Sequence, residues 1–133
     1  MDGRRPLVLI CDDEPALREL IRVTLGEEAY RFGEAATVSE SIEAARREPP
    51  DLVILDLMLP GGSGLDVLRA LRADEALSST VVVVVSAWSD EANQSAARRD
   101  GADAFVGKPF SPDRLVAQVE DLIGAPRSGR PER

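Results

Sequence analysis

The chain has 133 residues, a formal net charge of −8, one cysteine and no histidine. This length suits one domain with a sizeable core, and a single cysteine excludes a scaffold held together by internal disulfides. The acidic balance disfavours nucleic acid, because duplex binding depends on cationic contacts to phosphates, and the lack of histidine excludes histidine-based acid–base catalysis.

No segment is apolar and long enough to form a signal peptide or to span a membrane. We therefore expect a cytoplasmic protein that has no direct contact with a membrane or with nucleic acid. The single cysteine, Cys11, lies in an apolar run and is expected to be a core residue. Because histidine is absent, any metal must be held by oxygen atoms, which favours Mg²⁺, Mn²⁺ or Ca²⁺.

Apolar runs that end at turn or polar residues predict five strands along the chain. In chain order these strands cover residues 7–11, 30–35, 52–56, 80–86 and 104–106. Helical periodicity and capping residues predict five helices that alternate with the strands. The helices cover about 15–28, 37–48, 65–72, 90–100 and 112–123. The last segment, 125–133, is poor in apolar residues and is expected to be a disordered tail or the start of a linker.

The character of the strands predicts how the sheet is built. Five consecutive valines at 81–85 are typical of a central strand that is covered on both faces, whereas the weakly alternating segment 30–35 is typical of an edge. Strict alternation of strands and helices implies a parallel sheet with helices on both faces. We predict a flavodoxin-like, doubly wound α/β fold with five strands in the order 2-1-3-4-5 and five helices.

In this topology, the carboxyl ends of four strands meet at one crevice, where ligands bind in open α/β sheets. They deliver the side chains Asp12, Asp13, Asp56, Ser86 and Lys108. Carboxylates held together repel one another unless a cation lies among them, and Mg²⁺ suits such oxygen ligands while leaving positions for phosphate oxygens. A lysine and a hydroxyl suit the other phosphoryl oxygens, so the set indicates phosphoryl transfer to a carboxylate.

Each of these residues alone has a simpler interpretation. Asp56 and the pair Asp12-Asp13 would be turn residues, Ser86 a helix cap and Lys108 a surface charge. Their convergence at one crevice is what favours a site.

Several groups of residues make the chain resemble the receiver domain of two-component response regulators, the family of the chemotaxis response regulator. They are residues 10–14, 51–60 with Gly64, 85–87 and 101–110. The resemblance covers about residues 5–124, so we expect 1–124 to form a receiver domain. Each motif is weak alone, but together and in register they are specific.

The resemblance implies that Asp56 accepts a phosphoryl group from a phosphohistidine on a sensor histidine kinase or phosphotransfer protein. Asp13 and Asp56 would bind Mg²⁺ directly, with Mn²⁺ as an alternative. Asp12 would bind the ion through water, and the main-chain carbonyl of Met58 would be a further ligand.

The resemblance also assigns residues to the phosphoryl group and to the switch. Lys108 would pair with the phosphoryl group, aimed by a cis peptide before Pro109, and Ser86 would follow it by hydrogen bonding. Phe105 occupies the aromatic switch position, where the ring turns inward as Ser86 shifts. The alternative for Phe105 is a plain core aromatic residue.

Met58 and Trp88 lie two residues past Asp56 and Ser86, at positions that flank the path of the hydrolytic water in this family. Both side chains are bulky and apolar, and neither can orient an attacking water. We therefore predict slow autodephosphorylation. The chain is expected to be a phosphoacceptor domain that assists its own phosphoryl transfer, and not an enzyme in the ordinary sense.

Phosphorylation is expected to change the surface formed by the fourth helix, fifth strand and fifth helix, and so the binding of an unidentified downstream protein. The domain would be a monomer or a phosphorylation-dependent dimer. Gln118 stands where many DNA-binding relatives have an arginine used in dimer salt bridges, which makes that particular dimer less expected.

Two other functions compete with this interpretation. A Mg²⁺-dependent phosphatase of the haloacid dehalogenase type also forms an aspartyl-phosphate, but its nucleophile lies in an Asp-x-Asp pattern on the first strand, a spacing that Asp12-Asp13-Glu14 lacks. A pseudo-receiver that acts as a scaffold without phosphorylation is disfavoured by the complete set of acids.

Overall fold

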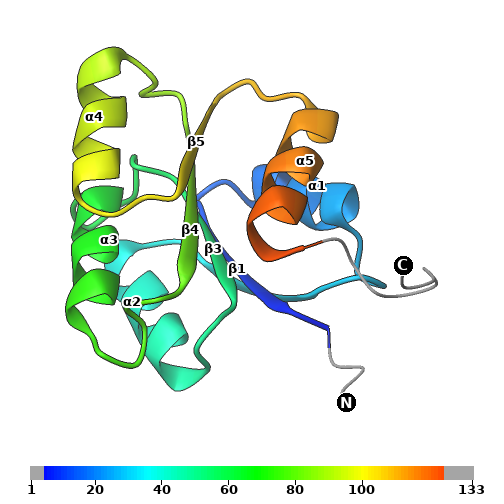
Figure 1. The fold of residues 1–133 in the computed structure, drawn as a ribbon, viewed down its shortest axis with the longest axis horizontal. Coiled ribbons are helices and arrows are strands. Elements are labelled where there is room, and N and C mark those ends of the chain that lie inside the picture. The colour runs from blue at the N-terminus through cyan, green and yellow to red at the C-terminus, as the bar shows by residue number, and fades with distance from the viewer. Residues whose placement is uncertain (1–4, 125–133) are drawn as a thin grey trace.

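The computed structural model describes residues 5–124, which form one five-stranded parallel sheet with helices on both faces (Figure 1). The strands are β1 (Leu7–Cys11), β2 (Arg31–Ala35), β3 (Leu52–Leu55), β4 (Val81–Ser86) and β5 (Ala104–Gly107). The helices are α1 (Pro15–Leu25), α2 (Val38–Arg47), α3 (Gly64–Ala73), α4 (Glu91–Arg99) and α5 (Pro112–Ile123). The strand order is β2-β1-β3-β4-β5, which confirms the predicted topology.

Two apolar layers hold the helices to the sheet. Helices α1 and α5 cover one face, and α2, α3 and α4 cover the other (Figure 1). Alternate residues of each strand point to opposite faces, so Val8 and Ile10 of β1 pack in the layer under α1 and α5, while Leu9 and Cys11 pack in the other layer. This double coverage explains why β1, β3 and most of β4 are continuously apolar.

The first helix is shorter than its sequence predicts. It ends at Leu25, not near residue 28, because Gly26 takes a positive φ of 95° and donates its N–H to the carbonyl of Arg22. Glycine is the residue that adopts this conformation without steric cost, so Gly26 ends the helix although acidic residues that favour helices follow it. The other helix ends lie within about two residues of their predicted positions.

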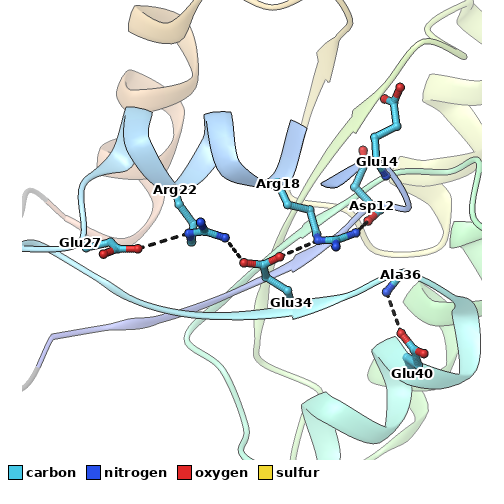
Figure 2. Close-up of polar contacts among 8 residues, drawn as sticks. All are labelled: Asp12, Glu14, Arg18, Arg22, Glu27, Glu34, Ala36 and Glu40. Carbon is cyan, nitrogen blue, oxygen red and sulfur yellow. Dashed lines mark hydrogen bonds and ion pairs between the residues drawn. The ribbon is translucent and has the colours of Figure 1, made fainter. Parts of the chain in front are cut away.

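The predicted capping box before α2 is present in a shifted form. The hydroxyl of Thr37 accepts a hydrogen bond from the N–H of Glu40 at 3.1 Å, as predicted. The Glu40 carboxylate, however, accepts from the N–H of Ala36 at 3.0 Å, one residue before the cap (Figure 2). Both contacts satisfy amides at the helix start.

The predicted tail, 125–133, lies outside the described residues. Within 5–124, no helix has the length and apolar character needed to cross a membrane. Cys11 is fully buried, as predicted, and burial raises the pKa of its thiol to about 12.

Candidate functional site

The carboxyl ends of β1, β3, β4 and β5 lie along one edge of the sheet, and the predicted site residues stand at these ends. Asp12 and Asp56 are the first residues after β1 and β3, which are adjacent strands. Ser86 is the last residue of β4, and Lys108 follows β5. Main-chain hydrogen bonds extend the strand pairing one residue past the strand ends. Asp56 N–H donates to the Cys11 carbonyl and Lys108 N–H to the Ser86 carbonyl, both at 3.0 Å.

The Lys108 ammonium lies between two buried carboxylates. Its Nζ is 3.0 Å from Oδ2 of Asp12 and 2.9 Å from Oδ2 of Asp56, and the Glu14 carboxylate is 3.9 Å away. Only 5% of each aspartate side chain is exposed. Two buried carboxylates around one ammonium leave an excess of negative charge, which favours a second cation at this position.

Burial and close contact shift the pKa values of Asp12 and Lys108. Loss of solvent raises the pKa of Asp12 above its usual value, although the Glu14 amide and the Lys108 ammonium act in the opposite direction. Burial alone would lower the pKa of Lys108, but its hydrogen bonds to Asp56 and Asp12 outweigh this effect and raise the pKa. Lys108 is therefore protonated at neutral pH.

Three strand ends share the same local turn. The Oδ1 of Asp12 accepts from Glu14 N–H at 2.9 Å, and the Oδ1 of Asp56 accepts from Met58 N–H at 2.9 Å. The Oγ of Ser86 accepts from Trp88 N–H at 3.1 Å. In each case the side chain binds the amide two residues further on, which orients both the side chain and the loop that follows it.

Met58 and Trp88 follow Asp56 and Ser86 by two residues, at the end of the sheet that carries Asp12, Asp56 and Lys108, here called the acid–lysine cluster. The two residues are 42% and 47% exposed. Ser86 binds the amide of Trp88 and does not cap α4, whose cap is the Asp90 side chain.

The donor set suits a Mg²⁺ ion. No group of three or more acidic, cysteine or histidine side chains positioned to hold a metal occurs among residues 5–124. The structure joins Asp12 and Asp56 through Lys108, whereas the side chain of Asp13 is exposed. Because Mg²⁺ usually binds through one or two carboxylates and keeps several waters, two buried carboxylates with adjacent loop carbonyls fit its chemistry. The role of Asp13 as a ligand stays a prediction.

The predicted switch residue, Phe105, is buried on β5. It is 8% exposed and packs in the layer that contains Val84 and Ala97, on the side covered by α4. The ring is therefore turned inward in this conformation, and its movement remains a prediction. The peptide bond between Lys108 and Pro109 is cis, as expected.

An ion-pair network beside the site was not predicted from the sequence. Arg18 of α1 donates from Nη1 to the main-chain carbonyl of Asp12 at 2.6 Å and from Nε to Glu34 of β2 at 2.6 Å (Figure 2). Arg22 donates to the other carboxylate oxygen of Glu34. Two arginines one turn apart on the helix that follows the acid loop were the available signal.

Gly64 leaves no room for a side chain, because the main chain of residues 56–57 passes close to it. A Cβ at this position would lie 2.3 Å from the Asp56 carbonyl oxygen and 2.7 Å from Leu57 Cα. Its N–H also binds the Leu57 carbonyl at 2.8 Å. A glycine here lets the start of α3 lie directly against the main chain of Asp56.

The structure is a doubly wound α/β domain with an acid–lysine cluster at its switch point, the place where open sheets of this kind bind ligands. The family model described as the response regulator receiver domain matches residues 8–120. The chain belongs to this family. It is a receiver domain of two-component response regulators, a signalling domain.

Curated relatives agree with this assignment. The chain is 41% identical over 119 residues to the DNA-binding response regulator MtrA of Mycolicibacterium smegmatis, a match that covers 90% of this chain and 51% of the relative. It is 36% identical over 116 residues to the phosphate regulon transcriptional regulatory protein PhoB of Pseudomonas aeruginosa, covering 87% of this chain and 51% of that protein. The chain therefore spans about half the length of these relatives.

Solved structures confirm the fold. The receiver domain of the Francisella response regulator 1452 matches with a TM-score of 0.81 and 27% identity, covering 89% of this chain and 96% of that one. The receiver domain of the sensor histidine kinase PA1611 of Pseudomonas aeruginosa has a TM-score of 0.82 and 22% identity, covering 91% and 99%. That structure is described with a magnesium ion coordinated in its active-site cleft.

Proposed function

We propose that Asp56 is the phosphoacceptor of this receiver domain and takes its phosphoryl group from a phosphohistidine on a sensor histidine kinase or phosphotransfer protein. The observation that carries the proposal is the Lys108 ammonium, held 2.9 Å from Asp56 and 3.0 Å from Asp12 at the carboxyl end of the sheet. This arrangement provides a nucleophilic carboxylate with a cation beside it for the incoming phosphoryl oxygens.

In the proposed transfer, Asp56 is the nucleophile and other residues hold the metal ion. A carboxylate oxygen of Asp56 bonds to phosphorus while the phosphorus–nitrogen bond of the donor breaks and its electron pair returns to the imidazole. Asp13, Asp56 and the main-chain carbonyl of Met58 would hold Mg²⁺, and Asp12 would bind one of its waters. When bound, this ion offsets the charge on the phosphoryl oxygens. Mn²⁺ has similar ligand preferences and would substitute for it.

After transfer, Lys108 and Ser86 bind the new phosphoryl oxygens. Lys108 would exchange its contact with the Asp56 carboxylate for one with the phosphoryl group. Ser86 would turn its hydroxyl away from the Trp88 amide, which it now accepts from at 3.1 Å. Phe105 lies on the strand beside β4, paired with Val84, so it would sense a movement of the β4 end.

The output would be a change in protein binding. The surface of α4, β5 and α5 carries the switch residue Phe105 and would change when the ring and Ser86 move. MtrA is described as DNA-binding, but this chain matches only about half of it and carries a net charge of −8, so its own surface suits a protein partner better. A cytoplasmic location and a phosphorylation-dependent dimer stay predictions.

The phosphorylated form should be long-lived. Met58 and Trp88 place half-exposed apolar side chains next to Asp56 and Ser86. Neither can accept a proton from water or orient it toward phosphorus, so autodephosphorylation lacks this assistance. A lifetime of seconds without a phosphatase would contradict this part of the proposal.

The test is phosphorylation by a small donor, acetyl phosphate, with Mg²⁺. Intact-mass measurement should show one added phosphoryl group on the wild-type chain and none on Asp56→Asn. The matched control is Asp51→Asn, at the other end of β3, which should be modified like the wild type. Failure of the wild type to become modified would favour a scaffold, and turnover of small phosphate esters would favour a phosphatase.

A further inference from the structure

Asp12 is held at four points by four different parts of the chain. Its main-chain N–H donates to the Ala35 carbonyl of β2 at 3.0 Å. Its side-chain oxygens accept from Glu14 N–H at 2.9 Å and from Lys108 at 3.0 Å. The fourth contact is to the main-chain carbonyl, which accepts from Arg18 Nη1 at 2.6 Å. This carbonyl belongs to the peptide that joins Asp12 to Asp13.

Arg18 is itself anchored. Its Nε donates to Glu34 of β2 at 2.6 Å, and Arg22, one turn further along α1, donates to the second oxygen of the same carboxylate. Figure 2 shows both arginines extending from α1 to Glu34, with Arg18 continuing to Asp12. Only 16% of the Arg18 side chain is exposed, so solvent screens this network less than an ordinary surface ion pair.

We propose that Arg18 is a positioning residue for residues 12–14, here called the acid loop, and acts through the peptide between Asp12 and Asp13. Peptide groups are planar, so fixing the Asp12 carbonyl also fixes the direction of the Asp13 amide and restricts where the Asp13 side chain can point. The planar guanidinium suits this task because two of its nitrogens make contacts in fixed relative directions. The inference rests on the proposed function, because it gives Arg18 a role in binding the ion that assists transfer to Asp56.

Electrostatics and positioning predict opposite results when the charge is removed. Arg18 is a cation near a cation site, so repulsion alone would make Arg18→Met bind Mg²⁺ more tightly. A positioning role makes the same variant bind more weakly, because the acid loop loses one of its four constraints. Changes in groups that orient metal ligands typically cost 10–100-fold in affinity, so we expect about tenfold weaker binding.

Two further variants separate the accounts. Arg18→Lys keeps the charge but loses the planar fork, and it should also bind Mg²⁺ more weakly than the wild type. Glu34→Gln removes the charged anchor and should weaken binding in the wild-type background but have little further effect beside Arg18→Met. Simple electrostatics predicts that Glu34→Gln weakens binding equally in both backgrounds.

The matched control is Arg31→Met, in β2, the edge strand that also carries Glu34. Arg31 also donates from one nitrogen to a main-chain carbonyl, that of Arg5 at 3.3 Å, and from another to a carboxylate, that of Glu48 at 2.9 Å. These contacts lie at the amino end of the sheet, away from the acid–lysine cluster. Its loss should change stability in urea to a similar extent and leave Mg²⁺ affinity unchanged.

The experiment titrates each variant of the 133-residue chain with MgCl₂ and follows Trp88 fluorescence, with the Mg²⁺-dependent shift of the urea midpoint as an independent reading. Weaker binding in Arg18→Met and Arg18→Lys but not in Arg31→Met supports the positioning role. Unchanged or tighter binding in both Arg18 variants overturns it and leaves the proposed function intact. If the wild type binds no Mg²⁺ by either reading, the proposed function itself fails and the positioning role fails with it.

Discussion

The two ends of the sheet each carry a pair of aspartates, and the pairs are used differently. At the amino end, Asp51 and Asp103 each accept a hydrogen bond from the main chain of a neighbouring strand, Leu7 N–H at 2.8 Å and Val82 N–H at 2.8 Å. At the carboxyl end, Asp12 and Asp56 accept from amides of their own loops and share the Lys108 ammonium.

The two pairs differ in whether their hydrogen bonds connect neighbouring strands or lie within a single loop. The amino-end aspartates complete the hydrogen bonding of strands that begin there, so their contribution is to stability. The carboxyl-end aspartates are oriented by short local turns and held close together with one compensating charge between two. Their charge exceeds that of the one ammonium between them, which favours a second cation at this end of the sheet. The amino-end aspartates thus connect neighbouring strands, whereas the carboxyl-end aspartates are the ones to which we assign a functional role.

Arg72 and Arg18 extend the comparison to the cations. Arg72 binds the carbonyls of Gly101 and Thr80 and also the Asp103 carboxylate, so it joins loops at the amino end. Arg18 binds one main-chain carbonyl, that of Asp12, at the carboxyl end of the sheet.

The largest expected effect comes from Gly64→Ala. The added Cβ would lie 2.3 Å from the Asp56 carbonyl oxygen, so main chain must move, and we expect a loss of about 3 kcal/mol in the free energy of unfolding. Urea denaturation measures it. Gly33→Ala, in β2, is the control, because Gly33 has no positive φ and its added Cβ would meet only the end of the Leu9 side chain at 3.3 Å, so it should change stability by about 1 kcal/mol or less. Equal losses would show that close approach to Asp56 is unimportant.

Removing an amino-end aspartate should come next. Asp103→Ala leaves the Val82 amide in the sheet without its 2.8 Å acceptor and takes one partner from Arg72, so we expect a loss of about 2 kcal/mol. Asp103→Asn keeps an acceptor oxygen and should lose less. Full phosphorylation of the folded Asp103→Asn variant by acetyl phosphate would show that Asp103 has a structural role only. Loss of phosphorylation in this variant would contradict that.

A polar residue at position 58 should speed hydrolysis of the phosphorylated domain. Met58→Asn places a hydrogen-bonding group beside Asp56 that can orient water, so we expect a several-fold shorter lifetime, equivalent to about 1 kcal/mol in the activation barrier. The decay of phosphorylated protein is followed by intact mass. Leu20→Asn, which replaces an exposed apolar residue of α1, is the control and should leave the decay unchanged.

The smallest effect is expected from Asp56→Asn without metal. It removes one of two buried carboxylate charges while Asn keeps an acceptor oxygen for the Met58 amide. We expect the free energy of unfolding to stay the same or rise by about 1 kcal/mol or less, because repulsion between the acids is relieved. A loss as large as that of Asp103→Ala would break the distinction between the two ends.

Much of this could be predicted because it depends on local patterns. The run Val81–Val85 identified a doubly covered strand, and the alternation of elements led to the strand order that places Asp12 beside Asp56. The end of α1 was missed because the acidic residues after Gly26 favour helix, and a positive φ at glycine ended it.

Contacts between distant segments could not be predicted in the same way. The bond from Arg18 to the Asp12 carbonyl depends on how α1 packs against β1 and on where Glu34 lies across the sheet. Nothing in the spacing of these residues along the chain specifies that distance. The exposure of Asp13, next to the buried Asp12, likewise depends on the path of the loop and not on residue type.

The most direct test of the account is to locate the phosphoryl group. After reaction with acetyl phosphate and Mg²⁺, borohydride reduction converts an acyl phosphate on aspartate to homoserine, and peptide mass spectrometry then identifies the position. We predict homoserine at position 56 alone, with positions 12, 13 and 51 unchanged. Homoserine at position 12 or 13, or no acyl phosphate at all, would contradict the assignment of Asp56 as the phosphoacceptor.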